Sequence, residues 1–104
     1  MAYGNALEAL ADPTRRAVFE RLRDGPASVQ CIADGLPVSR PAVSQHLKAL
    51  KQAGLVTDEA RGSARIYSIH RPGLKDLRDW LDGFWDDALE SFMKYAESKD
   101  DERS

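Results

Sequence analysis

The strongest constraint on the fold is the short connection between two predicted helices, at residues 29–36 and 40–53. Pro37 ends the first of these helices. Ser39 is suited to cap the second, which tolerates Pro41 in its first turn. Only a few residues then remain between the two helices. Helices joined this closely must meet at a corner, and this spacing is typical of a helix-turn-helix unit.

The chain before this corner predicts two more helices. Residues 5–11 form a short amphipathic run, and a second helix is expected from Pro13 to about Asp24. Asp12 can accept hydrogen bonds from the free N–H groups in the first turn of that helix, and Gly25 ends it. The corner is therefore expected to pack within a helical body.

The chain after the corner predicts a β-hairpin. Gly54 is suited to the left-handed conformation that closes a helix. Two β-prone runs follow, at residues 55–59 and 64–69, and a glycine-containing connection at 60–63 joins them.

One long helix is expected to complete the fold. Arg71-Pro72-Gly73 is expected to break the chain before this helix, which is predicted over residues 74–97. The polar residues 98–104 are expected to form a disordered tail. The predicted fold class is mainly α with a small β-hairpin, in the order α-α-α-α-β-β-α, as a single domain over residues 1–97.

The predicted helix at 40–53 has two contrasting faces. Val43, Leu47 and Leu50 recur at helical spacing and predict a buried stripe. The opposite face has no acidic residue and carries groups that suit phosphates and base edges: Arg40, Ser44, Lys48 and Lys51, flanked by Gln45 and Gln52. This pattern favours a DNA-reading helix over the alternative, a solvated polar face on a structural helix.

Charge is segregated along the chain. The 104 residues carry a net charge of −2, and the pI is about 5.6, which alone argues against a nucleic-acid binder. However, residues 39–65, which include Arg61 and Arg65 of the hairpin, carry +3, whereas residues 71–104 carry −4. The overall acidity therefore hides one basic segment.

An ordered set of motifs resembles the ArsR-type winged-helix repressors. The motifs are Ala9-Leu10-Ala11-Asp12-Pro13-Thr14-Arg15-Arg16, Val38-Ser39-Arg40-Pro41-Ala42-Val43-Ser44-Gln45-His46-Leu47-Lys48-Ala49-Leu50, Ala53-Gly54-Leu55-Val56, and Gly62 with Arg65 and Tyr67. The resemblance covers about residues 5–97. It implies a winged helix-turn-helix fold and a homodimer that represses a promoter by binding an imperfect palindrome in double-stranded DNA.

The resemblance also implies where DNA is bound. Helix 40–53 would read the major groove, and the wing at 60–65 would contact the DNA backbone or minor groove. A helix start such as Ser39 can offer both an N–H and a hydroxyl to a phosphate. The residues expected to contact DNA are Ser39, Arg40, Ser44, Gln45, Lys48, Lys51, Arg61 and Arg65.

The metal sites of that family do not carry over to this chain. The family's thiolate pair would fall at Ser28 and Gln30, and its last-helix site has no histidine here. Such metals need several Cys or His ligands together, so no metal and no cofactor are expected. Cys31 is expected to be a small buried side chain, with a redox-sensing thiol as the alternative. His46 is expected to be half-buried rather than bound to phosphate.

The predicted last helix is more apolar than a domain of this size needs for its own core. Large apolar patches rich in aromatic residues and Met usually mark an interface. With the first helix, it is expected to form a dimer interface through Leu7, Leu77, Trp80, Leu81, Phe84, Trp85, Ala88 and Phe92. The alternative is an effector pocket lined by Trp80, Phe84, Trp85 and Tyr95.

The sequence therefore indicates a dimeric DNA-binding transcriptional regulator. The alternative is a winged-helix protein-interaction module that does not bind DNA. An enzyme is not expected, because no catalytic constellation is recognisable. The single cysteine suits a reducing cytoplasm, and no stretch approaches the 18 apolar residues of a membrane span. No motif identifies an effector, and the sequence leaves open whether one exists.

Overall fold

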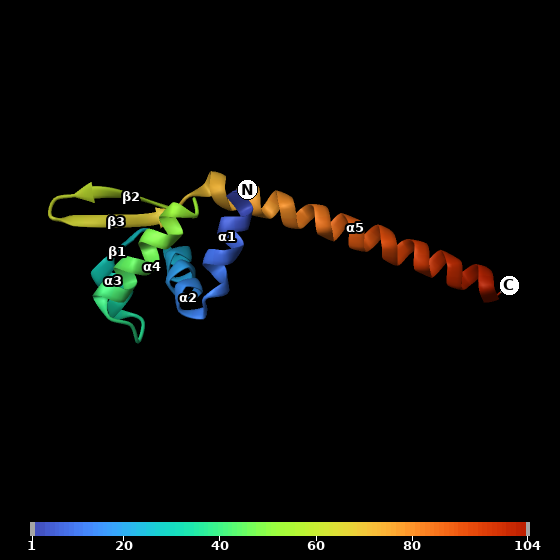
Figure 1. The fold of residues 1–104 in the computed structure, drawn as a ribbon, viewed down its shortest axis with the longest axis horizontal. Helices are drawn as coiled ribbons and strands as arrows, with labels where there is room; N and C mark the ends of the chain where they lie inside the picture. The colour runs from blue at the N-terminus through green and yellow to red at the C-terminus, as the bar shows by residue number, and fades with distance from the viewer. Residues whose placement is uncertain (1, 104) are drawn as a thin grey trace.

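A body of short helices lies beside a small antiparallel sheet, and one long helix projects away from both (Figure 1). The computed structural model describes the backbone of residues 2–103 and the side-chain surroundings of residues 5–98. The elements follow the order α1 (Ala2–Ala11), α2 (Pro13–Arg21), the 3-10 helix η1 (Leu22–Asp24), β1 (Ala27–Ser28), α3 (Val29–Asp34), α4 (Arg40–Gln52), β2 (Val56–Arg61), β3 (Ala64–Ile69) and α5 (Arg71–Arg103).

Side-chain caps start the short helices at the positions that the sequence predicts. The Asp12 carboxylate accepts from the backbone N–H groups of Thr14, at 2.9 Å, and Arg15, at 3.0 Å. The backbone N–H of Arg15 is the main cause that holds the pKa of Asp12 below its ordinary value. At the start of α3, the Ser28 hydroxyl accepts from the backbone N–H of Cys31 at 3.2 Å. These bonds satisfy N–H groups that a helix start otherwise leaves without a partner.

The sheet has three strands in the order β1-β3-β2, whereas the sequence predicts only a hairpin. Strand β1 pairs antiparallel with β3, with Ala27 opposite Tyr67 and Ser28 opposite Ile66. A strand of two residues is too short to show the alternating pattern by which strands are predicted from sequence. This strand is defined by its pairing with β3 alone. The extra strand ties the chain before α3 to the wing.

The bounds of the corner and the hairpin also differ from the prediction. Helix α3 ends at Asp34 rather than at residue 36, so residues 35–39 connect it to α4. Strand β2 extends to Arg61, because the antiparallel register continues until Arg61 faces Ala64. The hairpin connection is therefore the two residues 62–63 and not the four residues 60–63.

The prediction of a chain break at residues 71–73 is wrong. Helix α5 begins at Arg71 and includes all three residues, with Pro72 in its first turn. A proline is tolerated there because its missing N–H would have no partner within the helix. The first helical bond runs from the backbone N–H of Leu74 to the carbonyl oxygen of His70 at 3.2 Å.

The far end of α5 runs into the predicted polar tail. The backbone of α5 is helical to Arg103, beyond the predicted helix end at residue 97. The side chains from residue 99 onward lie outside the described residues, so the division between a domain at 1–97 and a tail at 98–104 stays a prediction. No helix within the described part of the chain has the length and apolar character to cross a membrane.

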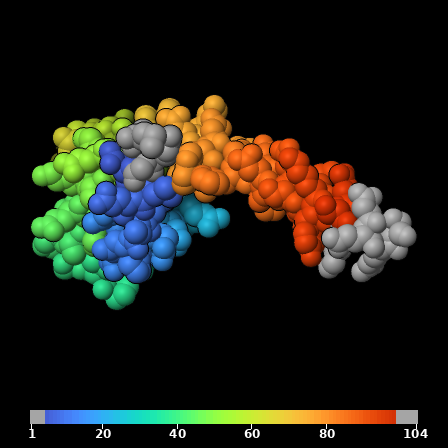
Figure 2. All heavy atoms as spheres, turned by 45° about the vertical axis from the view of Figure 1, so that its right-hand side comes forward, coloured from blue at the N-terminus to red at the C-terminus, as the bar shows by residue number. Residues whose placement is uncertain are grey.

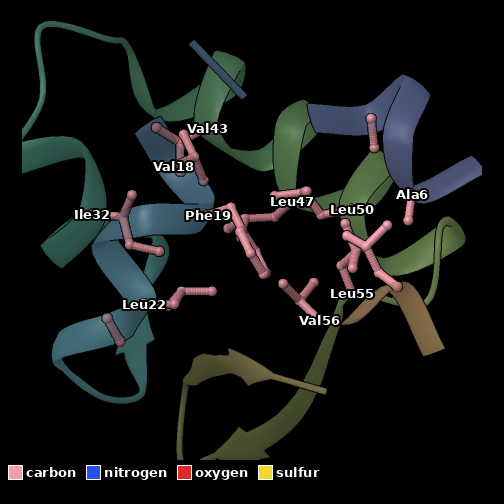
Figure 3. Close-up of a cluster of buried hydrophobic side chains, with 13 residues drawn as sticks. Ala6, Val18, Phe19, Leu22, Ile32, Val43, Leu47, Leu50, Leu55 and Val56 are labelled. Atoms are coloured by element: carbon pink, nitrogen blue, oxygen red, sulfur yellow. The ribbon is translucent and has the colours of Figure 1, made fainter. Parts of the chain in front are cut away.

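One hydrophobic core joins the helices to the base of the sheet (Figure 3). Side chains from α2, α3 and α4 meet there, and Val56 of β2 closes the cluster. The core side chains that have almost no exposed surface are Val18, Ile32, Val43, Leu47, Leu50 and Leu55. Among the residues described, no polar or charged residue is buried when backbone and side chain are taken together, although the side chain of Asp58 is only 6% exposed.

Helix α5 makes the protein elongated (Figures 1 and 2). The radius of gyration is 19.2 Å, and the extents are 71 × 26 × 22 Å. A compact chain of this length would have a radius of gyration of about 13 Å. The difference arises because α5 packs against α1 near its start and then leaves the body.

The start of α5 lies directly against the turn that follows α4. Gly54 adopts a φ of 79°, as a residue that closes a helix often does. The backbone of Gly73 approaches that of Gly54 so closely that a Cβ atom at Gly73 would overlap the Gly54 carbonyl group. Two backbone segments therefore meet at this point, with no flexible side chain that could move aside.

We expect Gly73→Ala to lower the free energy of unfolding by about 1–3 kcal/mol, because overpacking displaces backbone here. Chemical denaturation at a fixed protein concentration measures this change. Gly83→Ala is the matched control in the same helix, since a Cβ atom there meets nothing within 4 Å. The control should gain up to about 1 kcal/mol from helix propensity. Equal stability of the two variants would contradict the close approach.

Candidate nucleic-acid interface

The corner between α3 and α4 is set by a cap and by packing. The Ser39 hydroxyl accepts from the backbone N–H of Ala42 at 3.3 Å, and this bond starts α4 at Arg40. Helix α4 packs against both α2 and α3. The corner predicted from the sequence is therefore present, and α4 is its second helix.

Helix α4 has the two faces that the sequence predicts. Val43, Leu47 and Leu50 have no exposed surface, so this stripe fixes the rotation of the helix. His46 is half-buried at the edge of the stripe, as predicted. The opposite face is exposed and carries Arg40, Ser44, Gln45, Lys48, Lys51 and Gln52. Because α4 contains no acidic residue, this face offers hydrogen-bond donors with no carboxylate of its own helix among them.

The wing is the hairpin of β2 and β3. Arg61 ends β2, next to the turn, and its Nη2 atom lies 2.8 Å from the carboxylate of Glu59. Both side chains of this pair are exposed. Arg65 lies in β3, nearer the body, and its side chain is also more than half exposed. The two arginines predicted to contact DNA are therefore on the wing but at different positions along it.

Asp58 joins the wing to α4, and sequence reasoning missed this. Its two carboxylate oxygens lie 2.7 Å from Nζ of Lys51 and 2.7 Å from Nη1 of Arg65. The hydrogen bond from Lys51 is the main cause that lowers the pKa of Asp58, and the bond from Arg65 adds to it, while burial opposes both. The Asp58–Arg65 contact could have been predicted from the alternation of side chains along the strands, which puts the two residues on one face of the hairpin as diagonal neighbours.

The structure thus divides the predicted DNA-contacting residues into groups. Ser39 caps α4, and Arg40, Ser44, Gln45 and Lys48 lie along the helix without a link to the wing among the ion pairs of the described residues. Lys51 and Arg65 are brought together through Asp58, and Arg61 lies apart near the wing turn. Sequence spacing alone could not separate these groups, because Lys51 and Arg65 come from different elements.

Cys31 is exposed, which corrects the prediction of a buried side chain. The core of α3 is supplied by its neighbour Ile32, and adjacent residues of a helix point in directions about 100° apart. Within residues 5–98, no group of three or more His, Cys, Asp or Glu side chains is placed to hold a metal ion.

The part of α5 that projects from the body (Figure 2) carries exposed apolar side chains. Leu77 is only 5% exposed because it belongs to the core of this chain, so its predicted role as a surface contact needs correction. Trp80 is half-buried and makes an edge-to-face contact with Phe84, with ring centroids 4.7 Å apart. The large apolar side chains beyond Trp80 are exposed, namely Leu81, Phe84, Trp85, Leu89, Phe92, Met93 and Tyr95.

The predicted alternative is an effector pocket among the aromatic residues, and the hollow found beside them within residues 5–98 is lined by α5 alone. A hollow of about 210 Å³ is lined by Trp85, Ala88, Leu89 and Phe92, all from α5 itself. Trp80 and Tyr95 are not part of its lining. The aromatic residues therefore form an exposed stripe along one helix instead of an enclosed cavity.

Comparison with known proteins identifies the family. A helix-turn-helix domain model matches residues 10–59. The HTH-type transcriptional regulator Rv2034 of Mycobacterium tuberculosis is 52% identical over 93% of this chain and 91% of that protein. The transcriptional repressor SdpR of Bacillus subtilis is 35% identical over 77% of this chain and 89% of its own.

A solved structure with the same architecture carries the family name. It is the homodimeric winged helix-turn-helix DNA-binding domain of a possible ArsR-family regulator from Mycobacterium bovis. It has a TM-score of 0.67 and 27% identity, over 86% of this chain and 82% of that one. The present chain belongs to the ArsR family of transcriptional regulators. The family and the winged helix-turn-helix fold that the sequence predicts are confirmed.

We expect Ser39→Ala to lower the free energy of unfolding of this regulator by about 1 kcal/mol, because the start of α4 loses its side-chain cap. Ser44→Ala is the matched control, since Ser44 is exposed on the same helix and caps nothing. Its unfolding free energy should change by less than about 0.5 kcal/mol. Urea unfolding of both variants measures the difference, and equal losses would show that the cap does not hold α4.

Proposed function

We propose that this ArsR-family regulator is a homodimeric repressor that binds an imperfect palindromic operator in double-stranded DNA. The single observation that carries the proposal is the exposed, acid-free face of α4, held outward by a fully buried stripe on its other side. A helix presented in this way suits the major groove, and the adjacent wing can reach the backbone or minor groove. Repression is supported by the relative SdpR, which is named a transcriptional repressor.

We assign two kinds of DNA contact to α4. Arg40, Lys48 and the Ser39 hydroxyl are suited to phosphates, because cationic side chains and hydroxyls at helix starts commonly donate to phosphate oxygens. Ser44 and Gln45 are suited to base edges, because a hydroxyl or an amide can match one donor and acceptor pattern in the major groove. Arg61, near the wing turn, is assigned to the backbone or minor groove.

The apolar stripe of α5 supports the homodimer. It runs beyond the core of one chain, and the solved neighbour from Mycobacterium bovis is described as homodimeric. A second copy is the partner that offers a matching apolar stripe. The proposed interface retains Leu7, Trp80, Leu81, Phe84, Trp85, Ala88 and Phe92. A two-fold dimer would set two copies of α4 about 34 Å apart, one turn of DNA.

The remaining features of the proposal concern how and where the protein acts. It acts by binding and not by catalysis, because the side chains that the fold brings together form a cationic surface. It works in the cytoplasm with the DNA that it regulates. Residues 1–97 supply DNA binding and dimerisation, and residues 98–104 are a tail that supplies neither.

Selection of bound fragments from genomic DNA tests the proposal. The protein should retain a small set of fragments that share a palindromic site, and the affinity should fall steeply as salt rises. Retention of no fragment at low salt would contradict DNA binding. That outcome would favour the alternative, a winged-helix protein-interaction module.

We expect Lys48→Ala to weaken binding to every duplex, because a phosphate contact carries no sequence information. The slope of log affinity against log salt should become shallower by about one unit for each protomer. Fluorescence anisotropy on labelled duplexes measures both effects. Lys94→Ala removes the same charge from the projecting part of α5 and should change neither quantity.

Gln45→Ala provides the contrast on the same face of α4. It should relax the preference at one base pair of each half-site by about 1–3 kcal/mol while leaving the affinity for unrelated duplexes unchanged. Uniform losses on all duplexes would show that Gln45 does not read a base.

We expect Phe92→Glu to convert the protein to a monomer that remains folded. Phe92 is 65% exposed and lies far from the core of its own chain, so the substitution places a charge only in the proposed interface. Analytical ultracentrifugation should show a dimer dissociation constant raised by at least about 100-fold. Lys94→Glu introduces the same residue on the polar side of α5 and should leave the dimer intact. A fully dimeric Phe92→Glu protein would place the interface elsewhere.

A further inference from the structure

The carboxylate of Asp58 is the best covered acidic group in the wing. Only 6% of its side chain is exposed, whereas its strand neighbours Thr57 and Glu59 are exposed residues. Lys51, in the last turn of α4, and Arg65, in β3, each bring a cationic group to one of its two oxygens. Two cations from two elements therefore share one anion.

The contacts of Asp58 differ from the other ion pairs recorded for the described residues. Those other pairs join residues two to four positions apart along the chain, as in Arg61 with Glu59 or Lys94 with Glu90. Such exposed local pairs contribute little to stability. The pairs of Asp58 instead connect α4, β2 and β3, so they fix the wing relative to the helix proposed to read DNA.

Lys51 and Arg65 remain available to a further anion. Their side chains are 55% and 56% exposed, although both contact Asp58. A lysine ammonium has three N–H donors and an arginine guanidinium has five, so each keeps free donors after bonding one carboxylate oxygen. A phosphate of the DNA backbone can therefore meet both cations while Asp58 still holds them together.

The negative charge of Asp58 also has a cost for non-specific binding. Sequence-independent affinity for DNA rises with the number of cationic groups that neutralise phosphates. Asp58 cancels one of the two positive charges at this junction. Asp58 can therefore raise the affinity for DNA only by fixing the positions of the two cations. That benefit is limited to DNA sites whose backbone shape places a phosphate between them.

We propose that Asp58 is a positioning residue for sequence discrimination, which holds Lys51 and Arg65 as a two-cation clamp for a backbone phosphate at the junction of α4 and the wing. This inference rests on the proposed DNA-binding function. The carboxylate raises the ratio of specific to non-specific affinity because it fixes the clamp where the wing meets α4. Its negative charge also lowers the attraction to DNA of any sequence, and this second effect lowers both affinities alike.

The test compares Asp58→Asn with Glu59→Gln in the full chain. Both substitutions remove one negative charge from adjacent positions of β2, but the ion pair of Glu59 is with Arg61, near the wing turn. The probes are a duplex enriched by the unaltered protein from a random-sequence pool and a scrambled duplex of the same length and composition. Affinities are measured by fluorescence anisotropy at several salt concentrations, and circular dichroism checks the fold.

Both variants should bind the scrambled duplex more tightly than the unaltered protein. Asp58→Asn should lower the ratio of enriched to scrambled affinity by about 10-fold, while Glu59→Gln leaves that ratio unchanged. In a Lys51→Gln, Arg65→Gln background, Asp58→Asn should no longer change the ratio, because no clamp remains to be positioned. If Asp58 were important only for the stability of the fold, Asp58→Asn would still change the ratio in that background.

Equal changes of the ratio in Asp58→Asn and Glu59→Gln would overturn the proposal, since charge alone would then explain the effect. If Asp58→Asn does not fold, Lys51→Gln decides. This exposed substitution should lower the ratio while Arg65 stays bound to Asp58, and an unchanged ratio would overturn the clamp. Failure of the unaltered protein to enrich any duplex would instead refute the proposed function itself.

Discussion

The burial of one stripe of α4 is the interaction on which the rest of the protein depends. Val43, Leu47 and Leu50 are fully covered by the helices around them, and a helix is rigid enough that burying one face determines where the other points. The acid-free face is therefore presented to solvent as one surface. The Ser39 cap starts α4 and the turn at Gly54 follows its end, so these two residues bound the helix that carries this surface. Packing against apolar neighbours thus controls the position of groups that are themselves polar.

Packing decides which face of α4 is exposed, and ion pairs then decide how the cationic side chains on that face are held. The chain is acidic overall, yet residues 39–65, in α4 and the wing, carry a net charge of +3, whereas residues 71–104 carry −4. Within the basic segment, the positive groups are not equivalent. Arg40 and Lys48 have no recorded ion pair, whereas Lys51 and Arg65 share Asp58, whose pKa their hydrogen bonds lower. A count of charges along the sequence would not distinguish these four cationic residues, but the structure gives them different surroundings.

The surroundings of helix α5 change along its length. Its first turns belong to the core through Leu77, and the large apolar side chains beyond Trp80 are between 49% and 70% exposed. An apolar stripe of this length is costly to expose to water, which is the physical argument for a second copy as its partner. In that arrangement the same helix would link the dimer interface to α4, because its start lies against the turn that ends α4.

The sequence by itself determined the family, the helix-turn-helix corner, the caps at Asp12 and Ser39 and the two faces of α4, because each depends on neighbouring residues and a regular period. Only the tertiary structure decided the features that depend on residues far apart in the chain. Strand β1 exists because β3 pairs with it, and Leu77 is buried because the body of the same chain covers it. The exposure of Cys31 follows from the way α3 packs. The two partners of Asp58 come from α4 and β3, and no local pattern in the sequence records that they meet.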